Sequence, residues 1–198
     1  MSMLGITLLN ELIVSGNIDQ PGEILGQLRS KVKTMLVQEG NIRDQKDGMD
    51  MAIGVIDKAK MVLQFAGAYN PLYLIREREQ LTGNEPGVKT TVNGESGILF
   101  ELKGDKQPIG IHWEEKDFST QKVGLKEKDA VYVFSDGYID QYGGDQRKKF
   151  KTRKFKELLL SIQLESMGMQ KKLIEETFEK WRGNIEQIDD ICVIGVRV

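Results

Sequence analysis

The sequence predicts an α+β fold made of mostly antiparallel sheets with helices packed outside them. Three observations support this prediction: two amphipathic helical patterns open the chain, several strand-like runs follow them, and two more helical patterns precede a last apolar run. Because helices and strands do not alternate strictly, the order argues against a doubly wound parallel sheet. The 198 residues are enough for one core, so we expect a single domain over residues 1–198.

The chain opens with a helix pair. Leucines at four-residue spacing mark the first helix over residues 1–16. A Pro-Gly turn at residues 19–22 introduces a second amphipathic helix, which is expected to end near Gly40, and so short a joint makes the two helices antiparallel. The first helix is apolar from its first residues and has no capping residue, which indicates a chain that begins inside a larger domain.

The later elements follow from changes in hydrophobic period. Short runs with alternating apolar residues predict strands, and the first two of these form a hairpin. Longer runs with helical spacing predict two helices close to the end of the chain. We expect strands over residues 49–57, 61–67, 72–76, 88–92, 98–102, 118–123, 130–134 and 191–198, and helices over 154–163 and 170–181.

Composition excludes several classes of function. The net charge is -2, and the densest basic run, residues 147–156, is too short for a nucleic-acid groove and is expected to be a solvated face. Cys192 is the single cysteine, which excludes an internal disulfide and a multi-cysteine zinc site and favours a reducing cytoplasm. No apolar stretch approaches the ~20 residues that span a bilayer, so we expect no membrane contact by this segment.

The chemistry is expected around residues 130–144, where an apolar run stops at Asp136 and Gly137. A carboxylate at the end of a buried strand is well placed to bind a hard cation, and glycine permits a sharp turn and a close backbone approach. Carboxylate and carbonyl oxygens suit Mg²⁺ or Mn²⁺, whereas the chain lacks the thiolates and imidazoles that favour zinc. The alternative is that Asp136 only caps the turn after the strand.

A second acidic strand end strengthens the metal hypothesis. Asp189 and Asp190 stand directly before the last apolar run, so two acidic ends in one small domain can contribute to a carboxylate cage. Asp190 could instead be a hydrogen-bonding residue that starts the strand. Asp140 could lie in the second shell of the metal, although it could equally be a surface acid.

Other familiar catalytic arrangements are not indicated. His112 is the only histidine and has no nucleophile motif beside it, which argues against a Ser-His-Asp or Cys-His mechanism. No glycine-rich phosphate loop is present either.

Four motifs in order resemble the SpoIIE-type branch of the metal-dependent protein phosphatases, the protein phosphatase 2C (PPM) superfamily. The resemblance covers essentially the whole chain. It departs from the family at Ala68-Tyr69, where Ala-Gly-His-Asn-Pro is common, so any role of that histidine is absent. The motifs are Phe-Ala-Gly-Ala-Tyr-Asn-Pro at 65–71, Lys-Gly-Asp-Lys-Gln-Pro-Ile-Gly at 103–110, Phe-Ser-Asp-Gly at 134–137 and Asp-Asp-Ile at 189–191.

The resemblance implies an α-β-β-α sandwich of mostly antiparallel sheets flanked by helix pairs. It implies that Asp136 and Asp189 are the catalytic metal ligands, with Gly137, Asp140 and Asp190 around them. The family uses two Mn²⁺ or Mg²⁺ ions to activate a water that attacks phosphoserine or phosphothreonine. Paired metals suit that reaction because they lower the pKa of the water and neutralise charge on the phosphoryl group.

One family segment, Asp-x-Thr-Gly-His-Gly, has no counterpart in this sequence. In the family its aspartate bridges both metals, and it and the first strands precede the helix that residues 1–13 resemble. We therefore expect a C-terminal part of a longer bacterial regulator with an upstream sensor domain. This part alone should bind metal weakly and have little activity. Unpaired strands would expose a sheet edge, which favours a homodimer.

The resemblance suggests a phosphoprotein substrate, such as an anti-sigma-factor antagonist. A non-catalytic pseudophosphatase that binds a signalling partner is the main alternative. A different metallohydrolase built on the two acidic strand ends is a more distant one.

Overall fold

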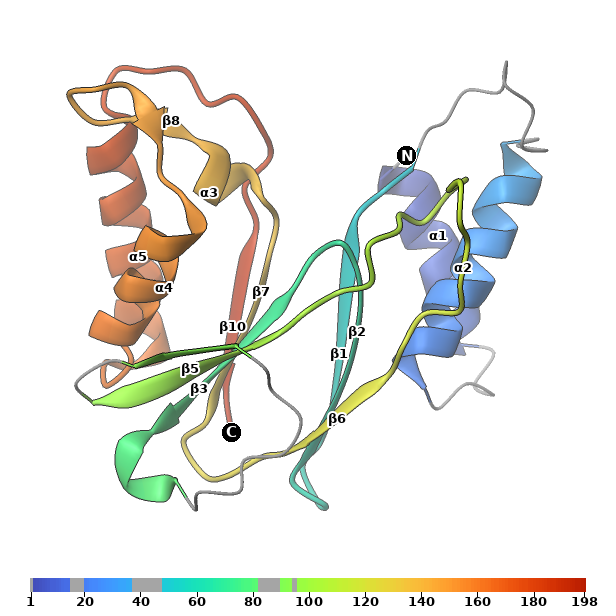
Figure 1. Ribbon diagram of the computed structural model, residues 1–198, viewed down its shortest axis with the longest axis horizontal. Helices are drawn as coiled ribbons and strands as arrows, with labels where there is room; N and C mark the ends of the chain where they lie inside the picture. The colour runs from blue at the N-terminus through green and yellow to red at the C-terminus, as the bar shows by residue number, and fades with distance from the viewer. Residues whose placement is uncertain (1, 15–19, 37–47, 82–89, 94–95) are drawn as a thin grey trace. The chain divides into compact units, whose positions relative to one another are not determined.

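A computed structural model describes residues 2–14, 20–36, 48–81, 90–93 and 96–198 (Figure 1). The chain divides into two compact units, and each is described here by itself. The first unit comprises Met1–Leu72 and Lys103–Gly124, and the second comprises Tyr73–Leu102 and Leu125–Val198.

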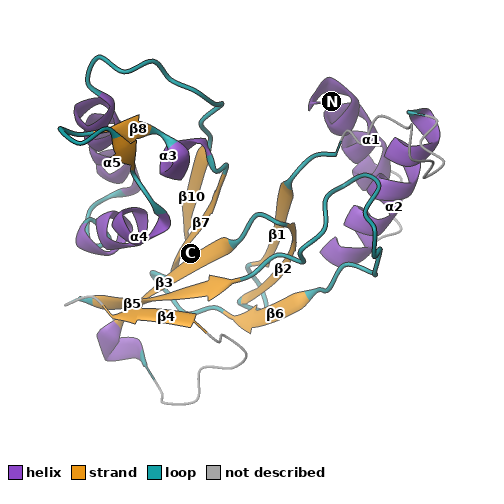
Figure 2. Ribbon diagram, turned by 45° about the horizontal axis from the view of Figure 1, so that its top comes forward, coloured by secondary structure: helices purple, strands orange, loops and turns teal. Residues whose placement is uncertain are grey.

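The first unit packs a helix pair on a small antiparallel sheet, as Figure 2 shows in purple and orange. The strand order is β1-β2-β6. Pro21 stands at the start of the second helix, where its missing N–H costs nothing. The elements are α1 (Ser2–Val14), α2 (Pro21–Met35), β1 (Met51–Asp57), β2 (Val62–Ala68) and β6 (Gln121–Gly124).

The core of this unit follows from the helical period. Leu25, Leu28 and Val32 lie on one face of α2 and are fully buried. They form one cluster with Leu8 and Leu12 of α1 and with residues of β2. The outer face of α1 keeps apolar side chains exposed.

The second unit carries a five-stranded sheet with the order β10-β7-β3-β5-β4 and two helices that share its core. Strand β10 pairs antiparallel with β7, and β4 pairs antiparallel with β5. The elements are β3 (Leu72–Glu77), η1 (Arg78–Gln80), β4 (Thr90–Asn93), β5 (Gly97–Leu102), β7 (Ala130–Phe134), α3 (Gly137–Asp140), β8 (Tyr142–Gly143), β9 (Lys148–Lys149), α4 (Thr152–Ser161), α5 (Met167–Arg182) and β10 (Val193–Arg197).

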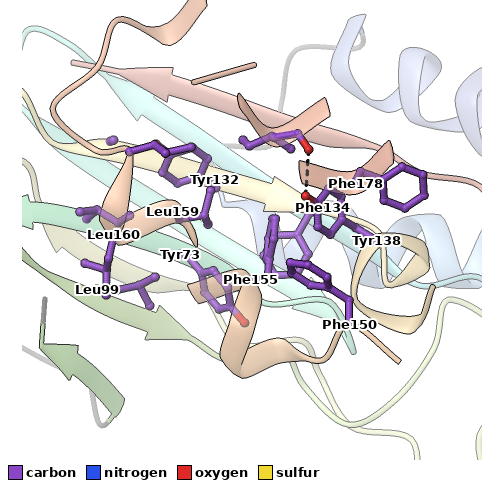
Figure 3. Close-up of a cluster of buried hydrophobic side chains, with 14 residues drawn as sticks. Tyr73, Leu99, Tyr132, Phe134, Tyr138, Phe150, Phe155, Leu159, Leu160 and Phe178 are labelled. Carbon is purple, nitrogen blue, oxygen red and sulfur yellow. Dashed lines mark hydrogen bonds between the residues drawn. The ribbon is translucent and has the colours of Figure 1, made fainter. Parts of the chain in front are cut away.

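Aromatic rings dominate the core of the second unit (Figure 3). Tyr138 contacts Phe150, Phe155 and Phe178 at centroid distances of 5.1, 4.8 and 5.2 Å. Its hydroxyl donates to the carbonyl oxygen of Ile174 in α5 (2.9 Å). Since Tyr138 belongs to the short helix that follows β7, this cluster fixes the chain immediately after the end of the strand.

The predicted mixture of helices and antiparallel sheet is confirmed. All four predicted helices are present, and the strand runs are found within a few residues of their predicted ends. Helix α2 ends at Met35, and the expected end near Gly40 lies outside the described residues, as do residues 88 and 89 of one expected strand. Among the described residues, no helix is long and apolar enough to cross a membrane.

Besides the 3-10 helix η1, three short elements were not predicted: α3, β8 and β9. Four-residue and two-residue elements are too short to show a hydrophobic period, so the sequence pattern carries no signal for them. They matter because they lie directly after the Ser-Asp-Gly motif.

Candidate active site

The candidate site begins where β7 ends. The side chains of β7 are almost all buried, whereas Asp136 is exposed two residues after the strand. Asp136 takes the N-cap position of α3, and its carbonyl oxygen accepts a hydrogen bond from the amide of Asp140 (2.9 Å). Its carboxylate makes no capping hydrogen bond. The turn therefore does not use this side chain, which counts against the capping alternative.

The neighbouring Ser135 attaches this strand end to the segment before β10. Its amide donates to the carbonyl oxygen of Cys192 (3.0 Å). Its hydroxyl donates to the carbonyl oxygen of Asp190 and accepts from the amide of Cys192, both at 2.9 Å. These bonds extend the β7–β10 pairing beyond its last ladder pair, Phe134 with Val193. The two acidic strand ends predicted from sequence are thus held side by side through their backbones.

Gly137 makes this approach sterically feasible. A Cβ atom built at this position would lie 2.4 Å from the carbonyl oxygen of Asp190 and 3.1 Å from its carbonyl carbon. Real Cβ atoms essentially never approach a neighbour closer than 3.0 Å, so only glycine fits here without displacement.

Asp189 and Asp190 are both exposed. The Asp189 carboxylate accepts a hydrogen bond from the amide of Asp190 (2.7 Å), and its carbonyl oxygen accepts one from the side chain of Gln187 (2.8 Å). Each carboxylate still has oxygen lone pairs available for a cation, because a carboxylate can accept about four bonds.

A buried glutamine, Gln141, holds the acidic loop in place. Its side-chain amide donates to the carbonyl oxygen of Glu186 (2.9 Å), and its side-chain oxygen accepts from the amide of Ile188 (3.4 Å). Trp181 of α5 donates its indole N–H to the Gln141 carbonyl oxygen (3.1 Å). Ser135 and Gln141 were not identified from the sequence, because an isolated serine or glutamine carries no periodic or spacing signal.

A lysine lies beside the site. The Lys149 ammonium contacts the Asp140 carboxylate at 2.8 Å, and both side chains are about 40% exposed. The hydrogen bond from Lys149 to Asp140 raises the pKa of Lys149, and the negative charge of Asp136 acts in the same direction. Asp140 is therefore an ion-pair partner as well as a neighbour of the candidate metal ligand.

The donor set suits a hard cation. Asp136 and Asp189 supply exposed carboxylates on the two segments that Ser135 joins, and oxygen ligands of this kind are what Mg²⁺ and Mn²⁺ prefer. Within the described ranges, no group of three or more His, Cys, Asp or Glu side chains gathers closely enough to hold a metal. The residues fit one part of a metal site and do not form a complete cage.

An apolar groove lies between α5 and β10. It encloses about 750 Å³, and its lining includes Tyr132, Phe178 and Ile194. Strand β10 lies at the end of the strand order, with Ile194 54% and Val196 39% exposed. This edge of the sheet is therefore apolar, whereas the strand ends at Asp136 and Asp189 are acidic.

A comparison with models of protein families identifies one family. The family model described as Stage II sporulation protein E (SpoIIE) matches residues 1–198. Among curated proteins, no match is found.

Solved phosphatase domains share the fold. The SiaA-PP2C domain of Pseudomonas aeruginosa superimposes with a TM-score of 0.78 at 24% identity, covering 99% of this chain and 68% of that chain. The RsbU and RsbW domains of a Mycobacterium tuberculosis protein give 0.65 at 18% identity, covering 100% of this chain and 46% of that one. The phosphatase domain of SpoIIE from Bacillus subtilis, presoaked with Mn, gives 0.52 at 16% identity, with coverages of 98% and 73%.

Proposed function

Because the chain belongs to the SpoIIE family of PP2C-like phosphatase domains, we propose that it takes part in metal-dependent hydrolysis of phosphoserine or phosphothreonine in a protein. One observation carries the proposal: Ser135 and Gly137 hold the Asp136 strand end against Asp190 and Cys192, in the segment that directly follows Asp189. The three carboxylates are exposed, and that of Asp136 makes no capping hydrogen bond, so the turn after β7 does not depend on it.

In the proposed reaction Asp136 and Asp189 would hold Mn²⁺ or Mg²⁺. The bound metal would lower the pKa of the attacking water and neutralise phosphoryl charge. Gly137 keeps the two acidic strand ends at a fixed spacing, and Ser135 prevents them from separating. Asp140 orients Lys149 next to Asp136, so that a positive charge stands where the phosphoryl group of a substrate would arrive.

Because the described residues gather fewer than three metal-ligating side chains at any one place, we propose weak metal affinity for these 198 residues by themselves. The same observation favours the second candidate function, a pseudophosphatase that binds a phosphorylated partner without hydrolysing it.

The proposed setting is a bacterial, cytoplasmic signalling pathway. The substrate would be a phosphoprotein such as an anti-sigma-factor antagonist, and a sensor domain in the same protein would control the activity. The exposed edge of β10, with Ile194 and Val196, would pair with a second copy of the chain.

The test combines Mn²⁺ titration by calorimetry with hydrolysis of a phosphoserine peptide. Asp136→Asn and Asp189→Asn should each abolish measurable Mn²⁺ binding, because each removes an anionic ligand of a site that has few. Asp145→Asn, an exposed acid in the β8–β9 turn, removes the same charge and should change nothing. Equal loss in all three variants would show that only bulk charge matters and would contradict the assignment.

Hydrolysis separates the two candidate functions. Phosphate release that rises with Mn²⁺ and is lost in Asp136→Asn supports the enzyme. Saturable binding of the phosphopeptide without phosphate release, at Mn²⁺ concentrations that saturate the protein, supports the pseudophosphatase.

A further inference from the structure

The basic run at residues 147–156 contains seven Lys or Arg and no acid, in a chain whose net charge is -2. It covers the end of the β8–β9 hairpin and the first half of α4. The sequence alone predicts that this run is a solvated face, and the structure shows which of its side chains have partners among the described residues and which do not.

Four of the seven cations have partners. Lys149 pairs with Asp140, Arg153 with Glu157 (2.8 Å) and Lys156 with Glu101 (2.9 Å). The Lys154 ammonium lies 3.7 Å from the centroid of the Trp181 ring. The described residues provide no such partner for the remaining three, Arg147, Lys148 and Lys151, which are all exposed. We call these three residues the cationic hairpin.

The cationic hairpin is attached to the chain that follows Asp136. The amide of Lys151 donates to the carbonyl oxygen of Ile139 (2.7 Å), and the amide of Phe150 donates to that of Gln141 (2.9 Å). Both acceptors lie at or just after α3, the helix that Asp136 begins. Backbone hydrogen bonds therefore attach the Lys151 end of the cationic hairpin to residues that follow Asp136 by three to five positions.

The hairpin is held rigidly. Phe150, between Lys149 and Lys151, is 4% exposed and packs edge-on against Tyr138 and Trp181 at centroid distances of 5.1 and 5.4 Å. Gly143 packs so closely on Trp181 that an added Cβ would lie 2.0 Å from its carbonyl oxygen. The charges are thus presented on a fixed scaffold.

The stability of the fold does not explain why cationic residues occupy these positions. Arg147 and Lys151 adopt positive φ angles of 47° and 76°, a conformation that costs a non-glycine residue roughly 1 kcal/mol or more. Cations near the first turn of α4 also oppose the helix dipole, which favours acids there. Glycine or asparagine in the turns and acids in the helix would stabilise the fold better.

We propose that the cationic hairpin is a docking surface for an acidic segment of the phosphoprotein substrate. This proposal rests on the proposed function, because docking here would deliver a phosphorylated side chain to the Asp136 strand end. Oppositely charged patches of this kind steer association and select partners.

The surroundings favour a short acidic peptide over a polyanion. Three free cations are few for a nucleic-acid tract, and the exposed acids Asp136, Asp189 and Asp190 of the same unit would repel a continuous line of phosphates. A peptide carries its charge in a short stretch and can present acids to the hairpin alone.

The experiment compares two labelled phosphoserine peptides by fluorescence anisotropy, one flanked by glutamates and the other by glutamines. The triple variant Arg147→Gln, Lys148→Gln, Lys151→Gln should bind the glutamate peptide about tenfold more weakly at low salt. The difference should shrink in high salt, and binding of the glutamine peptide should not change.

The matched control removes three lysines from α5 of the same unit, as Lys171→Gln, Lys172→Gln, Lys180→Gln, and should bind the glutamate peptide as the parent does. The single variant Lys148→Gln, in a strand with ordinary backbone angles, should show a smaller loss and guards against misfolding of the triple variant. Equal weakening in the α5 control, or unchanged binding in the hairpin triple, would overturn the proposal.

Two further readings separate the alternatives. Binding is measured with and without Mn²⁺, and turnover of a small phosphoester is followed in parallel. Absence of hydrolysis contradicts the enzymatic candidate of the proposed function, while the peptide arm still tests the docking surface. An oligonucleotide or anionic vesicles bound more tightly than the glutamate peptide, with loss in the hairpin triple, would replace the protein partner by a nucleic acid or a membrane.

Discussion

Replacing Gly137 by alanine is the sharpest test of how the candidate site is built. The added methyl group would stand 2.4 Å from the carbonyl oxygen of Asp190 and 3.3 Å from the side chain of Ile191. The first of these contacts is with backbone, which cannot rotate away as a side chain can. The chain must therefore move the Ser-Asp-Gly strand end away from the acidic segment before β10.

The size of the movement follows from the distances. Ordinary van der Waals contact begins at 3.4 Å, so relief of a 2.4 Å contact requires a displacement of about 1 Å. Overpacking of this kind costs about 1–3 kcal/mol of unfolding free energy. For a chain of this length that lowers the melting temperature by about 2–4 °C for each kcal/mol. A misplacement of about 1 Å at reacting groups can reduce a rate about 100-fold.

Gly137→Ala should therefore weaken Mn²⁺ binding and phosphopeptide hydrolysis much more than it weakens the fold. Calorimetric Mn²⁺ titration, initial rates of phosphate release and thermal unfolding measure the three effects. Gly168→Ala is the matched control, because a Cβ at this position of α5 meets nothing within 4 Å and alanine is a better helix former than glycine. A Gly137→Ala protein with parental metal affinity and parental stability would refute the claim that this glycine sets the spacing.

Three further predictions concern the second unit. Arg76→Met should cost about 3–5 kcal/mol in denaturant unfolding, because it leaves Asp129 charged and fully buried without its partner at 2.6 Å; a loss below about 1 kcal/mol would contradict this. Ser135→Ala should lower stability by about 1–2 kcal/mol and reduce Mn²⁺ affinity, whereas Ser161→Ala, which removes one exposed hydrogen bond, should do neither. Burial raises the pKa of Tyr132 from 10.0 to about 12, so the stability that the neutral phenol contributes is complete below pH 10 and is lost as the pH rises toward 12. Tyrosinate absorbance should therefore rise together with the loss of circular dichroism, and ionisation of Tyr132 without unfolding would contradict this.

Much of the fold could be predicted from hydrophobic period. The strand at residues 130–134 was placed with its exact ends, because five apolar residues stop at a polar triplet. The helix over Thr152–Ser161 was found with an error of two residues at its start, where the first turn is polar, and the helix over Met167–Arg182 with an error of three residues at its start. The hydrophobic pattern gives no information on α3 or on the two-residue strands β8 and β9, because these elements are shorter than the stretch over which a period can be recognised.

The sequence carries a local signal for the two acids of the candidate site, whose role stays a prediction, and it carries none for the residues that support them. Asp136 and Asp189 stand at changes from apolar to polar sequence, which is a local signal. Ser135, Gln141 and Lys149 act through hydrogen bonds to residues between 9 and 57 positions away, and such contacts depend on the tertiary fold. The basic run was visible in the sequence, but its attachment to α3 was not.

The meeting of the two acidic strand ends is a consequence of strand register. Phe134 pairs with Val193, and continuation of that antiparallel ladder brings the residues after Phe134 opposite those before Val193. A slip of one residue would turn every side chain of β10 to the opposite face and would move the Asp190 carbonyl away from Ser135. The register is therefore specified by the apolar run of β7 and by the bonds of Ser135, and the carboxylates of Asp136 and Asp189 take no part in the pairing of the two strands. It follows that Asp136 and Asp189 can be exchanged for asparagine without loss of fold, so their loss of metal binding would report on chemistry and not on structure.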